Sequence, residues 1–393
     1  MSKDIKYREV YLDNAATTQL DPRVFEKMKP FFGEIYGNPS SIYEKAQEAR
    51  NELDNARMTI AQIIGSSPEE IIFTSGGTES DNLAIFGIAR ANKKKGNHII
   101  TSAIEHHAVL HPCEQLEKEG FEVTYIPVEE NGIVDPAKVK EAMREDTILV
   151  SIMYANNEIG TIQPIAKIGR ACIKKQIHFH TDACQAAGAL DLNVDKLHLD
   201  LMTINGSKMY GPKGIGMLYV RSGTPLKPIM FGGEQEKRIR PGTENVAAIV
   251  GMAEALRLAQ EEREPENKRL IKLRDKLIQG ITDKVPKVRL NGDAENRLPN
   301  NVNMSILDIE GEALLLRLDM VGIAASSGSA CTSGSLDPSH VILALGLPYE
   351  VAHGSLRFSL GKNTTDEDID YVLERLPQIV KDLRAISPVR INM

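Results

Sequence analysis

The sequence predicts an α/β protein with a large, mainly parallel sheet domain and a smaller α+β domain. From about residue 69 to 220, short apolar runs rich in Ile and Val alternate with helical patterns. The charged segment EEREPEN (261–267) then interrupts the helical pattern, and few strands are expected beyond it. A chain of 393 residues also exceeds the usual size of one hydrophobic core. We expect residues 16–260 in the large domain, and 1–15 with 261–393 in the small one.

The large domain is expected to contain seven strands. Their apolar runs lie at residues 71–74, 98–102, 121–126, 148–153, 177–182, 201–204 and 216–220. Between them, stretches such as 79–93 and 164–174 repeat apolar residues at spacings of three and four, which predicts covering helices.

The small domain is expected to combine strands and helices in a different order. Within residues 288–360, the strand-like segments VRLNG, NVNMSI and SLRFSL surround the helical segment EALLLRLDMV. A final amphipathic helix at about 366–385 closes the domain.

Composition narrows the classes of function. Hydrophobic residues make up 42% and charged residues 26%, and the formal net charge of -7 gives no basic face for nucleic acid or an anionic membrane. No signal peptide or membrane span is expected, which favours the cytoplasm. The four cysteines include no CxxC pair, so we expect no structural zinc and at least one working thiol.

Lys208 lies in the glycine-rich segment NGSKMYGPKGIG (205–216), directly after an expected strand. A lysine at a strand end faces a cleft, where partial desolvation favours the uncharged, nucleophilic amine. Such an amine suits a Schiff base with an aldehyde cofactor. A solvated loop lysine is the ordinary alternative, and this segment alone does not decide between the two.

Asp182 ends the segment IHFHTD and is expected at the carboxyl edge of the sheet, where open α/β folds bind ligands. An aspartate there keeps a pyridinium nitrogen protonated, which makes pyridoxal phosphate an electron sink. Gln185 is placed to donate to the phenolate oxygen of that ring. Asp182 equally fits a helix N-cap, and both roles stay open.

An anion site is predicted at residues 74–88, TSGGTESDNLAIFGI. A strand there runs into two glycines, and Thr78 opens an amphipathic helix. Free N–H groups at the helix start and the Thr78 hydroxyl suit a phosphate ester. A simple helix cap with Glu79 in the first turn has a similar sequence.

Two adjacent histidines, His106 and His107, follow the strand expected at 98–102. One of them is placed to stack on a pyridine ring and to shuttle protons. A structural hydrogen-bonding histidine is the alternative. The pair lacks the i, i+4 spacing of helical metal ligands, and we predict no metal site.

Cys331 lies in AASSGSACTSGSLDPSHV (324–341), a run of small polar residues without apolar periodicity. We expect an exposed loop, whose thiol reaches both a bound substrate and an external acceptor. Cys113, Cys172 and Cys184 lie in helical or strand-flanking patterns and are predicted to be structural.

Together these segments resemble the NifS/IscS-type cysteine desulfurases, within the fold-type I, class V aminotransferase superfamily of pyridoxal phosphate enzymes. The resemblance covers nearly the whole chain, and its motifs follow the family's order. They are YLDNAATT (11–18), GNPSS (37–41), FTSGGTESDNLAI, IEHHAVL, NNEIGTIQP (156–164), HTDACQAAG, SKMYGPKGIG, RPGTENV, SSGSACTS and SLRFSLG.

The resemblance implies pyridoxal 5′-phosphate as the cofactor and a homodimer as the assembly. It implies that Lys208 forms the Schiff base, Asp182 pairs with the ring nitrogen, Gln185 with the phenolic oxygen, and His106 stacks on the ring. The phosphate contacts that it implies are Gly77, Thr78, Asn205, Gly206, Ser207 and, from the other subunit, Thr243. Asn157 and Arg357 are implied to hold the substrate carboxylate, Asn157 also lying against the cofactor.

The implied reaction converts L-cysteine to L-alanine and leaves a persulfide on Cys331. Its acceptor is a sulfur-acceptor protein such as an iron-sulfur scaffold, or RNA thiolation machinery, and Cys331 is a candidate transient ligand of an iron-sulfur cluster. A selenocysteine lyase or class V aminotransferase is the alternative within the superfamily. A noncatalytic sulfur carrier or scaffold is the alternative from another class, but it needs neither Lys208 nor Asp182.

Three departures from the family pattern affect these expectations. Ser207 stands where the family commonly has histidine, and Cys184 stands where threonine is common. The sequence ends with ISPVRINM, where IscS-type members often continue into a tail that docks the scaffold protein. The sequence therefore leaves the sulfur acceptor open.

Overall fold

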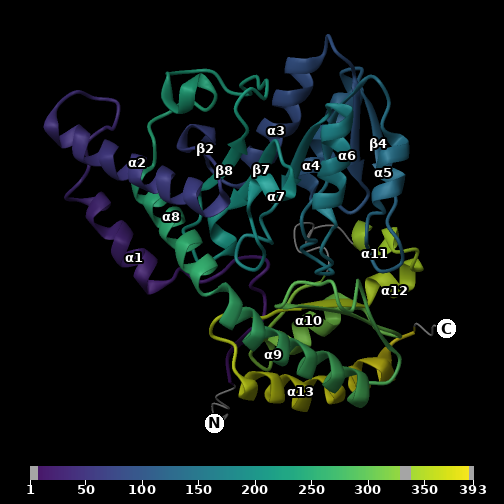
Figure 1. The fold of residues 1–393 in the computed structure, drawn as a ribbon. Helices are drawn as coiled ribbons and strands as arrows, with labels where there is room; N and C mark the ends of the chain where they lie inside the picture. The colour runs from purple at the N-terminus through teal and green to yellow at the C-terminus, as the bar shows by residue number, and fades with distance from the viewer. Residues whose placement is uncertain (1–7, 328–337, 389–393) are drawn as a thin grey trace.

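The computed structural model describes residues 8–327 and 338–388, and Cys331 lies outside them (Figure 1). Its largest sheet has seven strands in the order β2-β8-β7-β6-β5-β3-β4. All run parallel except β8, which is antiparallel to both of its neighbours. The strands are β2 (Ile71–Thr74), β3 (His98–Ser102), β4 (Glu122–Ile126), β5 (Thr147–Ser151), β6 (His178–Asp182), β7 (Leu201–Asn205) and β8 (Gly216–Val220). The predicted fold class is confirmed.

Helices cover both faces of this sheet, which explains why its strands are almost continuously apolar. Successive strand residues point to opposite faces, so Ile99 and Ile100 lie in different hydrophobic clusters. The Ile99 face packs against α3 (Gly77–Asn92) and α4 (His107–Lys118). The elements on the Ile100 face include α2 (Glu44–Ile64), α5 (Pro136–Ala142), α6 (Ile165–Lys175), α7 (Val194–Leu197) and α8 (Val246–Glu261), with α1 (Pro22–Met28) beside α8.

The C-terminal part forms a separate layer with its own core, drawn below the large sheet in Figure 1. Its antiparallel sheet has the order β12-β10-β9, and a short parallel pair joins β1 to β11. The strands are β1 (Val10–Tyr11), β9 (Val288–Leu290), β10 (Asn301–Ile306), β11 (Ile323–Ala324) and β12 (Ser355–Ser359). The helices are α9 (Arg263–Lys284), α10 (Gly311–Asp319), α11 (His340–Ala344), α12 (Tyr349–His353) and α13 (Asp366–Ile386).

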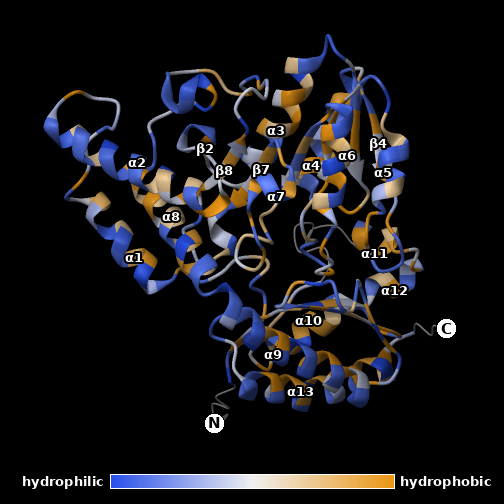
Figure 2. Cartoon of the chain, viewed as in Figure 1, coloured by the Kyte–Doolittle hydropathy of each residue, from blue (hydrophilic) through white to orange (hydrophobic). Residues whose placement is uncertain are grey.

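Hydrophobic burial supports the division of the chain into two domains. Val10 and Leu12 pack in the same core as α9 and α13, both of which carry mixed hydrophilic and hydrophobic residues in Figure 2. Helix α8 ends at Glu261 and α9 begins at Arg263, inside the charged interruption of the sequence. We therefore propose the limits 16–260 for the large domain and 1–15 with 261–393 for the small one. In the ranges that the structure describes, no helix has the length and apolar character of a membrane span.

Candidate active site

A cavity of about 330 Å³ lies at the carboxyl edge of the parallel strands. It brings together residues that the sequence separates by more than 250 positions. Those predicted from the sequence are Gly77, Thr78, His106, Asn157, Asp182, Gln185, Asn205, Lys208 and Arg357. His107, which the sequence offered beside His106 as the stacking histidine, also lines the cavity. Those not predicted as site residues are Ala15, Ala16, Asp81, Glu105, Met153, Ala155, Glu158, Cys184 and His340. The cavity thus collects most of the expected cofactor and substrate contacts.

Three other predicted residues do not line this cavity. Gly206 and Ser207 lie in the short η3 turn (Gly206–Lys208), where the amide and hydroxyl of Ser207 each donate to Asn205 Oδ1 at 3.2 Å. Thr243 is exposed and lies away from the cavity of its own chain. Cys331 falls outside the described residues, so its position relative to the cavity stays a prediction.

The start of α3 provides a backbone cradle that fits a phosphate group. The helix begins at Gly77, one residue earlier than Thr78, with Gly76 as its N-cap at φ 155°. A Cβ on Gly216 would lie 2.6 Å from the Gly76 carbonyl carbon, so the close approach of β8 requires glycine. A Cβ on Gly77 would lie 2.8 Å from Cys184 Sγ, so a side chain there would displace the thiol. The helix N-terminus therefore presents N–H groups to the cavity without side-chain obstruction.

Asp182 lines the cavity and caps a turn, so the expected helix N-cap is not formed. Its Oδ1 accepts a hydrogen bond from the Cys184 amide at 2.9 Å, so the carboxylate caps a turn rather than a helix. The side chain also lines the cavity at the end of β6. Burial and the nearby Asp182 charge raise the pKa of the Cys184 thiol well above its usual range. A carboxylate in this position suits the protonated nitrogen of a pyridine ring.

The side chains of Lys208 and Gln185 both donate a hydrogen bond to the Ala15 carbonyl oxygen. The Lys208 amine donates to Ala15 O at 3.0 Å and also to Ala16 O, while Gln185 Nε2 donates to Ala15 O at 3.0 Å. His106 is the N-cap of α4, and its Nδ1 accepts from the Ala108 amide at 3.1 Å. This bond assigns the imidazole proton to Nε2.

Arg357 is held on β12 with only 2% of its surface exposed. Its Nη2 pairs with Asp13 Oδ1 at 2.8 Å, and its Nη1 donates to Asn157 O at 3.0 Å. Its Nε is buried and has no hydrogen-bond partner among the described residues. A fixed guanidinium with spare N–H groups suits a ligand carboxylate.

Three buried acids in the cavity wall were not predicted as site residues. Burial raises the pKa of Glu105 to about 8 and that of Glu158 to about 7. Burial, followed by the Asp182 charge, raises the pKa of Asp81. The Ser339 hydroxyl donates to Glu158 Oε2, and the Met153 amide donates to Glu105 at 3.0 Å. The donated hydrogen bonds favour the charged carboxylates, but burial outweighs them, so these acids keep their protons to a higher pH than free carboxyl groups do.

The three cysteines within the described residues are poor candidates for a nucleophile. Burial raises the pKa of Cys113 and of Cys172, and Cys184 is shifted in the same direction. Thiolates are the reactive form, and these three side chains stay protonated at neutral pH. This is consistent with the structural roles expected for them.

Comparison with known proteins places the chain. The model of the aminotransferase class-V family matches residues 10–372. The chain belongs to this family. Within the class-V family it is 54% identical to "Cysteine desulfurase IscS" of Clostridium botulinum (strain Hall), over 97% of each chain. It is also 54% identical to "Cysteine desulfurase IscS" of Methanosarcina thermophila, over 97% of this chain and 94% of that protein. A solved "NifS-like protein" matches 96% of this class-V chain and 100% of its own, with a TM-score of 0.90 and 39% identity.

Proposed function

We propose that this class-V enzyme is a cysteine desulfurase that converts L-cysteine to L-alanine and moves the sulfur onto Cys331, with pyridoxal 5′-phosphate as cofactor. The observation that carries the proposal is one cavity holding Lys208, Asp182 and the start of α3 together. A lysine, a carboxylate and a phosphate cradle are the contacts that this cofactor needs. The names of the similar proteins support the choice of substrate.

The residues at the cavity would form one group that binds the phosphate of such a cofactor and another that binds its ring. Gly77 and Thr78 at the start of α3 would hold the phosphate, with further contacts from Asn205, Gly206 and Ser207. Asp182 would face the ring nitrogen, while Gln185, Asn157 and His106 would contact the ring and its oxygen. When bound, the cofactor supplies an electron sink for the pair of electrons released at the substrate α-carbon.

The protein's own groups bind the substrate and move its protons and sulfur. Arg357 and Asn157 orient the cysteine carboxylate, and the Lys208 amine removes the α-proton. The Cys331 thiolate then attacks the substrate sulfur, so that a sulfur–sulfur bond forms while the carbon–sulfur bond breaks. The carbon fragment takes up a proton, for which His106 Nε2 is the proposed source, and leaves as alanine.

The test is alanine formation from cysteine in the presence of pyridoxal phosphate and a thiol reductant. The parent protein should show the visible absorption of a lysine-bound cofactor and release alanine and sulfide. Lys208→Ala should lose both signals. Conversion of selenocysteine alone would favour a lyase, and undiminished turnover of Lys208→Ala would reject the cofactor argument.

We also propose that the enzyme works as a homodimer. Large apolar side chains are exposed at Phe32, Tyr36, Ile42 and Phe231. One groove is lined by Ser40 and by Glu244, and Glu244 is the residue after Thr243. A second copy covering this face would bury the apolar side chains and bring Thr243 to the other subunit's phosphate.

Mixing two inactive variants tests this assembly. A Lys208→Ala chain keeps Thr243, and a Thr243→Ala chain keeps Lys208, so their mixed dimer should regain one complete site. Recovered activity after co-expression supports the exchange of Thr243. Co-expressed variants that stay as inactive as the separate ones, or a fully active monomer in sedimentation, contradict it.

We propose the cytoplasm as the location and a sulfur-acceptor protein, such as an iron-sulfur scaffold, as the partner of persulfidated Cys331. Capture of the persulfidated enzyme's complexes from its own cell extract, followed by measurement of labelled sulfur on the captured protein, tests this partner. Sulfur label appearing on thiolated RNA alone would redirect the proposal.

A further inference from the structure

Residues 15–18, the end of the motif YLDNAATT, wrap around the turn that carries Lys208. We propose that Thr18 is a positioning residue, whose hydroxyl fixes the backbone on both sides of Lys208. This inference rests on the proposed role of Lys208 as the attachment point of the cofactor.

One hydroxyl group makes both contacts. Thr18 Oγ1 donates to the Ser207 carbonyl at 3.0 Å and accepts from the Tyr210 amide at 2.7 Å. The Thr18 amide also donates to the Ser207 carbonyl at 3.0 Å. Thr18 is 3% exposed, so water does not easily replace these bonds. The residue before Lys208 and the second residue after it are therefore joined through one side chain.

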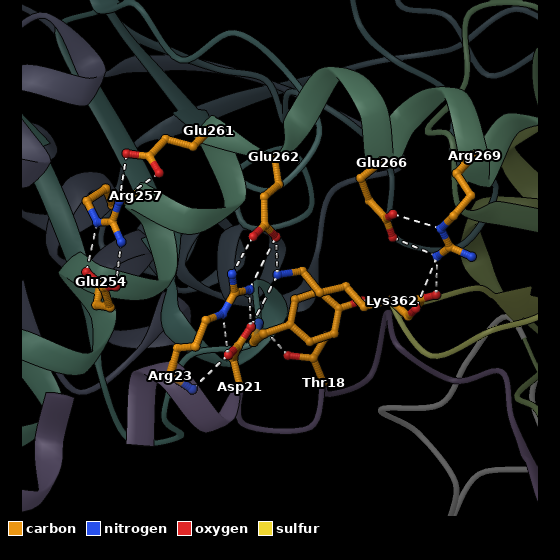
Figure 3. A network of polar contacts seen from close by, with 12 residues as sticks. Thr18, Asp21, Arg23, Glu254, Arg257, Glu261, Glu262, Glu266, Arg269 and Lys362 are labelled. Carbon is orange, nitrogen blue, oxygen red and sulfur yellow. Dashed lines mark hydrogen bonds and ion pairs between the residues drawn. The ribbon is translucent and has the colours of Figure 1, made fainter. Parts of the chain in front are cut away.

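The backbone conformation of the Lys208 turn is unfavourable by itself and needs stabilising contacts from other segments. Tyr210 has φ of 62°, a left-handed conformation that is unfavourable for an aromatic residue. Besides Thr18, the Asp21 amide donates to Tyr210 O at 3.0 Å, and the Lys362 amide donates to the Tyr210 hydroxyl at 2.8 Å. Figure 3 shows Thr18 and Asp21 beside Lys362 in one polar network. Contacts from the N-terminal segment with Thr18 and Asp21, and from Lys362 after β12, thus maintain the conformation of Tyr210.

The same segment also holds the lysine amine. Ala15 O and Ala16 O both accept from Lys208 Nζ. The amine and the backbone of its turn are therefore placed relative to one segment, residues 15–18. Loss of the Thr18 hydroxyl should let the turn shift relative to the two carbonyls and displace the amine in the cavity.

The neighbouring Thr17 offers a matched control. Its hydroxyl is buried and makes no hydrogen bond within the described residues. Thr18→Val and Thr17→Val remove the same atom from adjacent residues, whereas Thr18→Ser keeps the bonding hydroxyl. Two measurements on cofactor-free protein compare them: the rate of Lys208 acetylation by acetic anhydride, read by mass spectrometry, and the rate at which added pyridoxal phosphate gains its lysine-bound absorption.

Thr18→Val should change the acetylation rate of Lys208 relative to exposed lysines and slow cofactor attachment about tenfold. Its kcat for cysteine should fall more than its KM changes. Thr17→Val and Thr18→Ser should both stay within about twofold of the parent in all these rates, since each keeps the bridging hydroxyl.

Thr18→Val rates equal to those of Thr17→Val would overturn the proposal, even if its melting temperature fell, because a purely structural role predicts that result. If Thr18→Val does not fold, Thr18→Ser decides: parent rates support the hydroxyl bridge, and slow cofactor attachment in a folded protein overturns it. Neither rate needs turnover. A parent protein that forms no alanine would reject the desulfurase proposal separately.

Discussion

Arg357 and Asp13 form an ion pair at the cavity wall, with Nη2 and Oδ1 2.8 Å apart. The Arg357 side chain is almost fully buried, and its Nη1 donates a second hydrogen bond, to Asn157 O. The pair fixes the plane of the guanidinium before any ligand arrives. A substrate carboxylate would then meet an oriented bidentate donor rather than a flexible charge.

Arg357→Lys should therefore weaken cysteine binding more than it slows the chemical step. Lysine keeps the charge but lacks the planar donor, and we expect KM for cysteine to rise about 10- to 100-fold. Asp13→Asn is the companion variant, expected to lower the free energy of unfolding by about 1–3 kcal/mol through loss of the pair. Steady-state kinetics and urea unfolding measure the two effects. An Arg357→Lys enzyme with the parent KM would exclude the proposed carboxylate contact.

Glu158 should make the stability of the protein decrease as pH rises. Burial raises the pKa of Glu158 to about 7, so between its unfolded pKa and pH 7 the folded state holds more protons than the unfolded state. The free energy of unfolding then falls across this window, by about 3 kcal/mol for this group. Glu158→Gln removes the titration, keeps an acceptor for the Ser339 hydroxyl, and should flatten the profile.

Urea unfolding of cofactor-free protein between pH 4.5 and 7.5 checks the Glu158 profile. Glu130→Gln, at an exposed position, is the control and should leave the slope unchanged. Equal slopes for the parent and Glu158→Gln would mean that this acid does not titrate as its burial predicts.

Glu262 lies between α8 and α9 and links this junction to Arg23 and to Lys362 (Figure 3). It accepts from Arg23 Nη1 at 2.5 Å and from Lys362 Nζ at 2.8 Å. The Arg23 hydrogen bond chiefly lowers the pKa of Glu262, so its stabilisation is present above the unfolded pKa and disappears as pH falls.

Glu262→Gln should lower the free energy of unfolding by about 0.5–1 kcal/mol near neutral pH, and less in 1 M salt. Glu261→Gln is the matched control, because among residues 8–327 and 338–388 the ion-pair partner of Glu261 is Arg257 of its own helix. Thermal melts at two salt concentrations compare them. If Glu261→Gln lowers the melting temperature as much as Glu262→Gln does, the ion pairs of Glu262 between α8 and α9 contribute no additional stability.

Cys331→Ser should separate cofactor binding from sulfur transfer. The hydroxyl stays protonated at neutral pH and cannot replace a soft thiolate nucleophile. The variant should bind pyridoxal phosphate with the parent spectrum and accumulate a spectroscopically distinct intermediate with cysteine, while alanine formation falls by orders of magnitude. Alanine formation at the parent rate would show that sulfur leaves by direct elimination instead.

The sheet was predictable because its strands carry a local signal. Runs such as 71–74 and 216–220 match β2 and β8 at both ends, since strands that are covered on both faces of the sheet are apolar along their whole length. Lys208, Asp182 and Gly77 were found for a related reason: Asp182 ends β6, Lys208 and Gly77 come shortly after β7 and β2, and the carboxyl ends of these strands gather at one edge of the sheet.

The residues that were missed act across long sequence distances. Thr18 meets the Lys208 turn nearly 190 positions away, and no periodicity in the sequence reveals that contact. Glu105 and Glu158 carry charged side chains, which sequence patterns place at the surface, whereas the fold buries both. Their positions depend on tertiary packing rather than on local pattern.

Gly216 faces Thr74 of β2 on one side and Asn205 of β7 on the other. Thr74 and Asn205 are therefore separated by two strand spacings, about 10 Å. The chain turns back across this gap after Thr74, because a Cβ on Gly77 would lie 3.6 Å from the Asn205 Cβ. The start of α3 and the Lys208 turn therefore approach each other, so that one phosphate group would be held from both sides at once.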